Sequence, residues 1–119
     1  QDVGGLGNLA YVTDWFEDLM VIDVSQPAQP SLVNRISTDA FADGLEVGGY
    51  FKNLLYVLSP GKFQIFDVAD PVAPYLRGMI SIPGDLGGTD TFRDVVSDGN
   101  IAYISGNHIG LIVLEITTP

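Results

Sequence analysis

Leu19-Met-Val-Ile-Asp-Val-Ser-Gln-Pro27 is the stretch that decides the fold, because its pattern returns twice later in the chain. The second copy reads Phe63-Gln-Ile-Phe-Asp-Val-Ala-Asp-Pro71, and the third reads Leu111-Ile-Val-Leu-Glu-Ile-Thr-Thr-Pro119. Each copy follows a shorter apolar segment that contains a tyrosine. These tyrosines are Tyr11, Tyr56 and Tyr103, spaced by 45 and 47 residues. Repeats of this length built from short apolar strands are typical of β-propeller blades.

Turn residues and prolines divide each repeat into strands. The third strand of each repeat is apolar on both sides rather than alternating, which predicts a sheet that is covered on both faces. The first turn is expected at Gly4-Gly5-Leu-Gly7. The predicted strands are Asp2–Gly4, Leu9–Thr13, Leu19–Val24, Ser31–Ser37, Leu45–Gly48, Leu54–Leu58, Phe63–Val68, Tyr75–Ile82, Asp94–Ser97, Ile101–Ser105 and Leu111–Ile116.

The predicted fold class is all-β, with propeller blades of four antiparallel strands. Residues 1–119 are expected to form a single propeller segment, with repeats at about 1–43, 44–92 and 93–119. The strands fall into groups of four, four and three, or about 2.75 blades. Closed propellers typically need 4–8 blades. We therefore expect either a piece of a longer polypeptide or one of several copies that complete a propeller together.

Composition narrows the classes of function. The net charge is −10, from 15 acidic and 5 basic residues, so binding to nucleic acid is not expected. The residues are 46% hydrophobic, too many for a disordered chain. No apolar run approaches the roughly 20 residues of a transmembrane helix, so direct membrane insertion is not expected. The chain has no cysteine, which excludes disulfides and thiol catalysis.

The segment Ala10-Tyr11-Val12, followed by Trp15-Phe16 and Asp23-Val24-Ser25, resembles the LVIVD-repeat family. Asp67-Val68-Ala69-Asp70-Pro71 matches the same pattern, whereas Glu115-Ile116-Thr117 departs from it by conservative changes. The resemblance implies a β-propeller from a bacterial or archaeal cell-surface or secreted protein, with a periplasmic location as a variant. It implies no catalytic residues.

Two side chains recur at fixed places in the repeat, and we interpret both as structural. Tyr11, Tyr56 and Tyr103 are expected in the core, each with its hydroxyl at a polar edge. Acidic residues end the third strands just before the proline corners, where a carboxylate can accept backbone N–H bonds in an Asx turn. These acids are Asp23, Asp67 and Glu115.

A candidate binding surface lies on the loops that join second to third strands and blade to blade. In an up-and-down blade these loops emerge at the same end, which brings acids together with aromatic residues. Such a rim suits a protein or a carbohydrate, or the acids solvate one face while the aromatics pack between blades. The ligand-binding candidates are Asp14, Trp15, Phe16, Glu17, Asp18, Asp39, Asp43, Asp85 and Asp90.

Metal binding and catalysis have weaker signals. Asp85 and Asp90 flank a glycine-containing loop and are the candidate calcium ligands, although the loop lacks the spacing of an EF-hand. His108 is the sole histidine, so a site with several histidines is excluded. No nucleophile elbow surrounds His108, so no catalytic residue is assigned. We expect no required cofactor.

The leading interpretation is a non-catalytic extracellular or cell-surface module that mediates protein interaction or structural assembly. Its expected partners are another protein or sister subunits. Two alternatives remain open. One is part of a propeller enzyme with its active site in the central channel, and the other is a calcium-dependent propeller that binds carbohydrate or protein.

Overall fold

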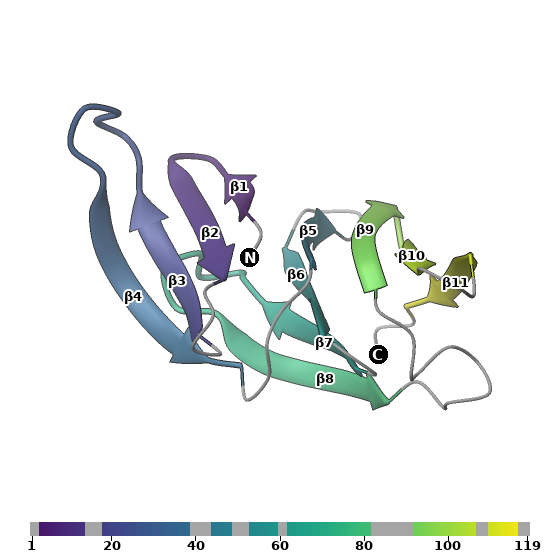
Figure 1. The fold of residues 1–119 in the computed structure, drawn as a ribbon. Helices are drawn as coiled ribbons and strands as arrows, with labels where there is room; N and C mark the ends of the chain where they lie inside the picture. Colours follow the sequence, from purple (N-terminus) through teal and green to yellow (C-terminus); the bar gives the residue numbers. More distant parts are fainter. Residues whose placement is uncertain are drawn as a thin grey trace.

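The three repeats fold into three antiparallel β-sheets (Figure 1). The computed structural model describes residues 3–13, 18–38, 44–48, 53–59, 62–81, 92–106 and 110–116. Within these residues every regular element is a strand and none is a helix. The predicted all-β fold class is confirmed, as three sheets that have the form of blades in a partial propeller.

We name the sheets blades 1, 2 and 3 in chain order. Blade 1 contains β1 (Val3–Leu6), β2 (Leu9–Thr13), β3 (Asp18–Asp23) and β4 (Ser31–Ser37). Blade 2 contains β5 (Gly44–Gly48), β6 (Leu54–Ser59), β7 (Lys62–Asp67) and β8 (Tyr75–Ser81). Blade 3 contains β9 (Phe92–Asp98), β10 (Ile101–Gly106) and β11 (Leu111–Glu115). In every blade the spatial order of the strands follows the chain.

The first hairpin turn differs from the prediction. The expected turn at Gly4–Gly7 is wrong, because Gly4 and Gly5 pair with Tyr11 and Ala10 as part of β1. The chain reverses instead at Gly7-Asn8, with Gly7 at a φ of 60°. A two-residue hairpin loop requires a positive φ at its first position, and glycine adopts this without strain. The Gly99 turn of blade 3 has the same form, with a φ of 59°.

One backbone hydrogen bond closes each blade at the same place. The first residue after each third strand donates its N–H to the carbonyl of the asparagine before the second strand. The three bonds are Val24 to Asn8 at 2.8 Å, Val68 to Asn53 at 2.9 Å and Ile116 to Asn100 at 2.6 Å. The third strands therefore end one residue earlier than predicted. The next residues, Val24, Val68 and Ile116, are still tied to the second-strand side of the hairpin by this one hydrogen bond.

The core lies between the blades rather than within them. The innermost strand of blade 2, β5, lies beside β1 on one side and β9 on the other, and the sheets splay outward from these strands (Figure 1). The first seam, between blades 1 and 2, buries Tyr11, Leu19, Val21, Leu45, Leu55, Val57, Phe66 and Val68. The second seam, between blades 2 and 3, buries Leu54, Tyr56, Leu58, Phe63, Val95, Ala102, Ile104 and Ile116.

Strand β6 shows why the sequence lacks an alternating pattern. Leu55 and Val57 belong to the first seam, whereas Leu54, Tyr56 and Leu58 belong to the second. Successive side chains of a strand point to opposite faces, so both faces of blade 2 are apolar. We call the face toward the next blade in the chain the forward face, and the opposite one the back face.

The outer strands carry a bulge at equivalent positions. Val21 pairs with Asn34 but the next residue, Ile22, pairs with Leu32, so Val33 is an extra residue in β4. Arg77 is the corresponding extra residue in β8. Bulges increase the local twist of the strand that contains them.

Glycine at position 48 is required by close packing. A Cβ at Gly48 would overlap the Tyr56 ring, with Cζ only 2.8 Å away, and would lie 3.0 Å from Ser97 Oγ. We expect Gly48→Ala to destabilise the chain by about 1–3 kcal/mol, because the buried Tyr56 ring has to move. Gly78→Ala is the matched control, since no atom lies within 4 Å of its Cβ position.

Chemical denaturation of the two variants measures this difference. Equal free energies of unfolding for Gly48→Ala and Gly78→Ala would contradict the packing described for the second seam.

Candidate functional site

Most of the predicted loop surface lies outside the described residues. This applies to Asp14, Trp15, Phe16, Glu17, Asp39, Asp43, Asp85 and Asp90, and also to His108. Asp18 is the one ligand-binding candidate that the structure describes. The predicted acidic and aromatic rim therefore stays a prediction.

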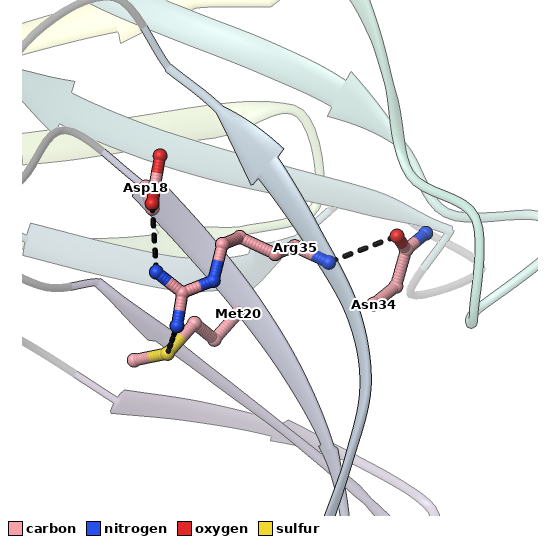
Figure 2. Close-up of polar contacts among 4 residues, drawn as sticks. All are labelled: Asp18, Met20, Asn34 and Arg35. Carbon is pink, nitrogen blue, oxygen red and sulfur yellow. Dashed lines mark hydrogen bonds and ion pairs between the residues drawn. The ribbon is translucent and has the colours of Figure 1, made fainter.

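Asp18 forms an ion pair with Arg35 across the β3–β4 hairpin (Figure 2). The Arg35 Nη1 atom is 2.9 Å from Asp18 Oδ2, and its Nη2 donates to Met20 Sδ at 3.6 Å. The backbone N–H of Arg35 is held by Asn34 Oδ1 at 2.8 Å. Half of the Arg35 side chain is exposed, so this pair contributes at most about 1 kcal/mol. The contact gives Asp18 a local partner at the surface of blade 1.

The expected Asx turns are present after two third strands. Asp23 Oδ1 accepts the N–H of Ser25 and Asp67 Oδ1 accepts the N–H of Ala69, each at 2.8 Å. The hydrogen bonds from Ser25 lower the pKa of Asp23 below its usual value. Glu115 holds the same register position in blade 3 and is exposed.

Asp67 has further partners besides the Ala69 N–H. The Tyr75 hydroxyl donates to Asp67 Oδ2 at 3.1 Å, and Arg77 Nη1 lies 3.5 Å from the same oxygen. The Asp67 side chain is largely buried. This carboxylate joins the corner to the outer strand of blade 2.

The repeated tyrosines lie on the forward faces. The Tyr11 hydroxyl donates to the carbonyl of Pro71 at 2.7 Å, and so joins blade 1 to the proline corner of blade 2. Burial, and secondarily the nearby charge of Asp70, raises the pKa of Tyr11. Tyr56 is fully buried, with its ring centroid 5.3 Å from that of Phe63. Tyr103 is only half-buried.

Other polar contacts cross the seams at positions that do not repeat. Asn34 Nδ2 donates to the Val72 carbonyl, and Gln64 Nε2 donates to the Thr38 carbonyl, both at 3.0 Å. In the second seam Glu46 Oε2 accepts from the N–H of Ser97 at 2.8 Å and from its Oγ at 3.3 Å. Sequence reasoning missed these residues. The one sequence signal for these contacts was Glu46, an acidic residue between the apolar residues Leu45 and Val47.

An apolar patch covers the forward face of blade 3, and its residues were not among the predicted ligand-binding candidates. Val96, Leu111 and Val113 are 53%, 62% and 56% exposed. Tyr103 lies between them, because it pairs with Val96 on one side and with Val113 on the other. We call Val96, Tyr103, Leu111 and Val113 the blade 3 patch.

Blade 2 shows what such a face does when it is covered. Tyr56 corresponds to Tyr103, Phe63 to Leu111 and Ile65 to Val113, as the matching registers show. Tyr56 and Phe63 are fully buried against blade 3, and Ile65 packs at the same seam. The blade 3 patch is thus an exposed copy of a surface that is buried one blade earlier.

Neither a metal cluster nor a membrane-spanning helix is found in the part of the chain that the structure describes. No three acidic or histidine side chains there are close enough to hold a metal ion. No helix there is long and apolar enough to cross a membrane.

Comparison with known proteins supports the repeat and the fold. Residues 1–38, which include blade 1, match the family model described as LVIVD repeat. The resemblance inferred from the sequence is confirmed over these residues. A search of curated proteins gave no match.

One similar solved structure is the crystal structure of a functionally unknown protein from Desulfotomaculum acetoxidans DSM 771. The TM-score is 0.71 at 19% sequence identity, so the two share a fold. The match covers 92% of this chain and 37% of that protein. This chain therefore corresponds to little more than a third of the similar protein.

Removing the Asp67 carboxylate tests whether its hydrogen bonds stabilise the proline corner of blade 2. We expect Asp67→Ala to lower the free energy of unfolding by about 1–3 kcal/mol, because partly buried donors lose their acceptor. Asp67→Asn keeps an acceptor for the Ala69 N–H and should cost less. Asp23→Ala, at a solvent-exposed turn, should cost less than Asp67→Ala. Denaturant unfolding measures all three, and an unchanged Asp67→Ala variant would contradict the structural role.

The raised pKa of the buried Tyr11 hydroxyl predicts that the chain loses stability at alkaline pH. Its pKa is raised above 10.0 in the folded chain, so ionisation is harder in the folded than in the unfolded state. The resulting stability is present below pH 10.0 and is lost as the pH rises through the raised pKa.

Unfolding measured across this pH range should show a steeper alkaline loss for the wild type than for Tyr11→Phe. At neutral pH the variant should be less stable by about 1 kcal/mol, for one lost hydrogen bond. Identical alkaline profiles would rule out the buried hydroxyl as the cause.

Proposed function

We propose that this chain, which begins with an LVIVD repeat, is a non-catalytic structural module that binds protein through the blade 3 patch. The single observation that carries the proposal is the exposure of this patch at positions buried in blade 2. An exposed contiguous apolar surface marks an interaction site more often than scattered apolar residues do.

The energetics support binding by another sheet face. Fully burying one Val or Leu side chain contributes roughly 1.5–3 kcal/mol, and the patch holds three such residues beside Tyr103. A flat face of three strands suits a second sheet better than a small ligand, which requires a concave pocket. A protein surface built from strands is therefore the partner that fits.

The charge of the chain favours specific contact over general adhesion. A net charge of −10 opposes the approach of other acidic surfaces. Contact at the patch then depends on burial of the apolar row, which has to outweigh this repulsion when the partner is also acidic. An assembly at a cell surface or outside the cell is the setting we propose, on the basis of the repeat family.

Val113→Asp tests the proposal. The change places a carboxylate in the middle of the patch, where binding would bury it without a partner. We expect self-association of the chain to weaken by roughly tenfold or more, measured by sedimentation over a range of concentrations. The fold should be retained, because position 113 is exposed in the free chain.

Val33→Asp is the matched control, since Val33 is 45% exposed but lies on the outer strand β4, away from the patch. Association that Val33→Asp and Val113→Asp weaken equally would contradict the proposal.

A further inference from the structure

The first seam buries polar side chains beside its apolar core, and two of these side chains have a polar atom that lacks a partner in the protein. Ser59 is fully buried and Gln64 is 4% exposed. Among the residues that the structure describes, neither Ser59 Oγ nor Gln64 Oε1 forms a hydrogen bond. Buried polar atoms of folded proteins nearly always have a partner, either in the protein or in an ordered water molecule. These two atoms therefore point to a bound molecule within the seam.

Ser59 and Gln64 lie on the same face of blade 2. Gln64 pairs with Val57, and Ser59 comes two residues after Val57 on β6. Paired residues share a face, as do residues two apart on one strand, and Val57 is buried in the first seam. Ser59 is thus the diagonal neighbour of Gln64, at a spacing of roughly 7–8 Å that a long side chain reaches across. One small molecule between the two polar atoms can contact both.

The other polar atom of Gln64 fixes which way its amide faces. The Nε2 atom donates to the Thr38 carbonyl at 3.0 Å. Because a carbonyl oxygen only accepts, the amide nitrogen and not the amide oxygen has to face Thr38. Gln64 Oε1 is therefore an acceptor on the other side of the amide, and it requires a donor. The Ser59 hydroxyl offers one proton and two lone pairs to the same molecule.

The repeat itself does not require a polar side chain at either place. The equivalent of Gln64 in blade 3 is Ile112, as the matching registers show, and Ile112 packs against the apolar core of the second seam. Ser59 likewise corresponds to Gly106, since each comes three residues after the tyrosine of the second strand. The second seam is thus built without these two polar side chains, so the fold does not demand them in the first.

We propose that the first seam binds an internal water molecule, which donates to Gln64 Oε1 and accepts from the Ser59 hydroxyl. Internal waters typically form about three hydrogen bonds with buried groups that lack another partner. A water fits both atoms because it donates and accepts. A calcium ion fits less well, since it takes about 6–8 oxygen ligands and no cluster of three acidic or histidine side chains lies in the described part of the chain.

The water connects two blades through the Gln64 amide. Gln64 donates to Thr38, the residue that follows the last strand of blade 1, and the water extends this contact to the end of β6. A polar bridge thus holds the first seam where the second seam has apolar packing. The site lies between blades 1 and 2, so the inference does not depend on the blade 3 patch.

A crystal structure of the chain tests the site directly. We expect one water whose oxygen lies about 2.5–3.0 Å from both Gln64 Oε1 and Ser59 Oγ. A direct hydrogen bond between the two side chains would overturn the proposal. An ion surrounded by about six oxygens at roughly 2.3–2.6 Å would overturn it as well.

Magnetic relaxation dispersion of the water oxygen gives a second measurement in solution, because it detects buried waters that exchange slowly and does not respond to hydroxyl protons. Gln64→Met keeps the length of the side chain and removes both polar atoms, so it should lower the dispersion amplitude by about one water per chain. Asn34→Ala is the matched control, since Asn34 also donates across the first seam but at an exposed site, and its amplitude should equal that of the wild type.

An unchanged amplitude in Gln64→Met, or an equal loss in Asn34→Ala, would contradict a water bound at Gln64. If Gln64→Met does not fold, the crystal structure of the wild-type chain still decides the question.

Discussion

The structure depends on one constraint, which is that each blade is apolar on both faces and so needs a neighbour on each side. Strand β6 satisfies this constraint in blade 2, because Leu55 and Val57 are buried in the first seam and Tyr56 and Leu58 in the second. A single sheet of this kind could not keep both faces out of water. Folding is therefore a property of adjacent repeats, and the blades stabilise one another in sequence.

The two seams share their apolar design but differ in their polar contacts. The tyrosine repeats in every blade, whereas Asn34 and Gln64 bond across the first seam and Glu46 bonds across the second. A buried polar group needs its own partner, so it penalises a wrong neighbour more than an apolar side chain does. These non-repeating residues help to define which blade lies beside which.

The repeat made much of the fold predictable. Strands β2 and β4 have their predicted bounds, and the all-β class and the Asx turns at Asp23 and Asp67 are present. The predicted position of the turn after β1 was wrong, because the sequence does not show which of the three early glycines, Gly4, Gly5 or Gly7, adopts the positive φ. Contacts such as Asn34 with Val72 were not predictable, since they join residues 38 apart whose registers depend on both sheets. The individual residues of the blade 3 patch were not predicted for the same reason, because the exposure of a side chain depends on what lies beside it.

The bulges at Val33 and Arg77 have a consequence for how such chains grow. An outer strand with a regular edge is a template on which strands of other molecules can add. Each bulge interrupts the ladder and twists the strand at the same point, so a straight incoming strand cannot pair along its length. Lateral, amyloid-like growth at the periphery is thereby disfavoured, and contact through the broad faces of the sheets is left as the easier direction of assembly.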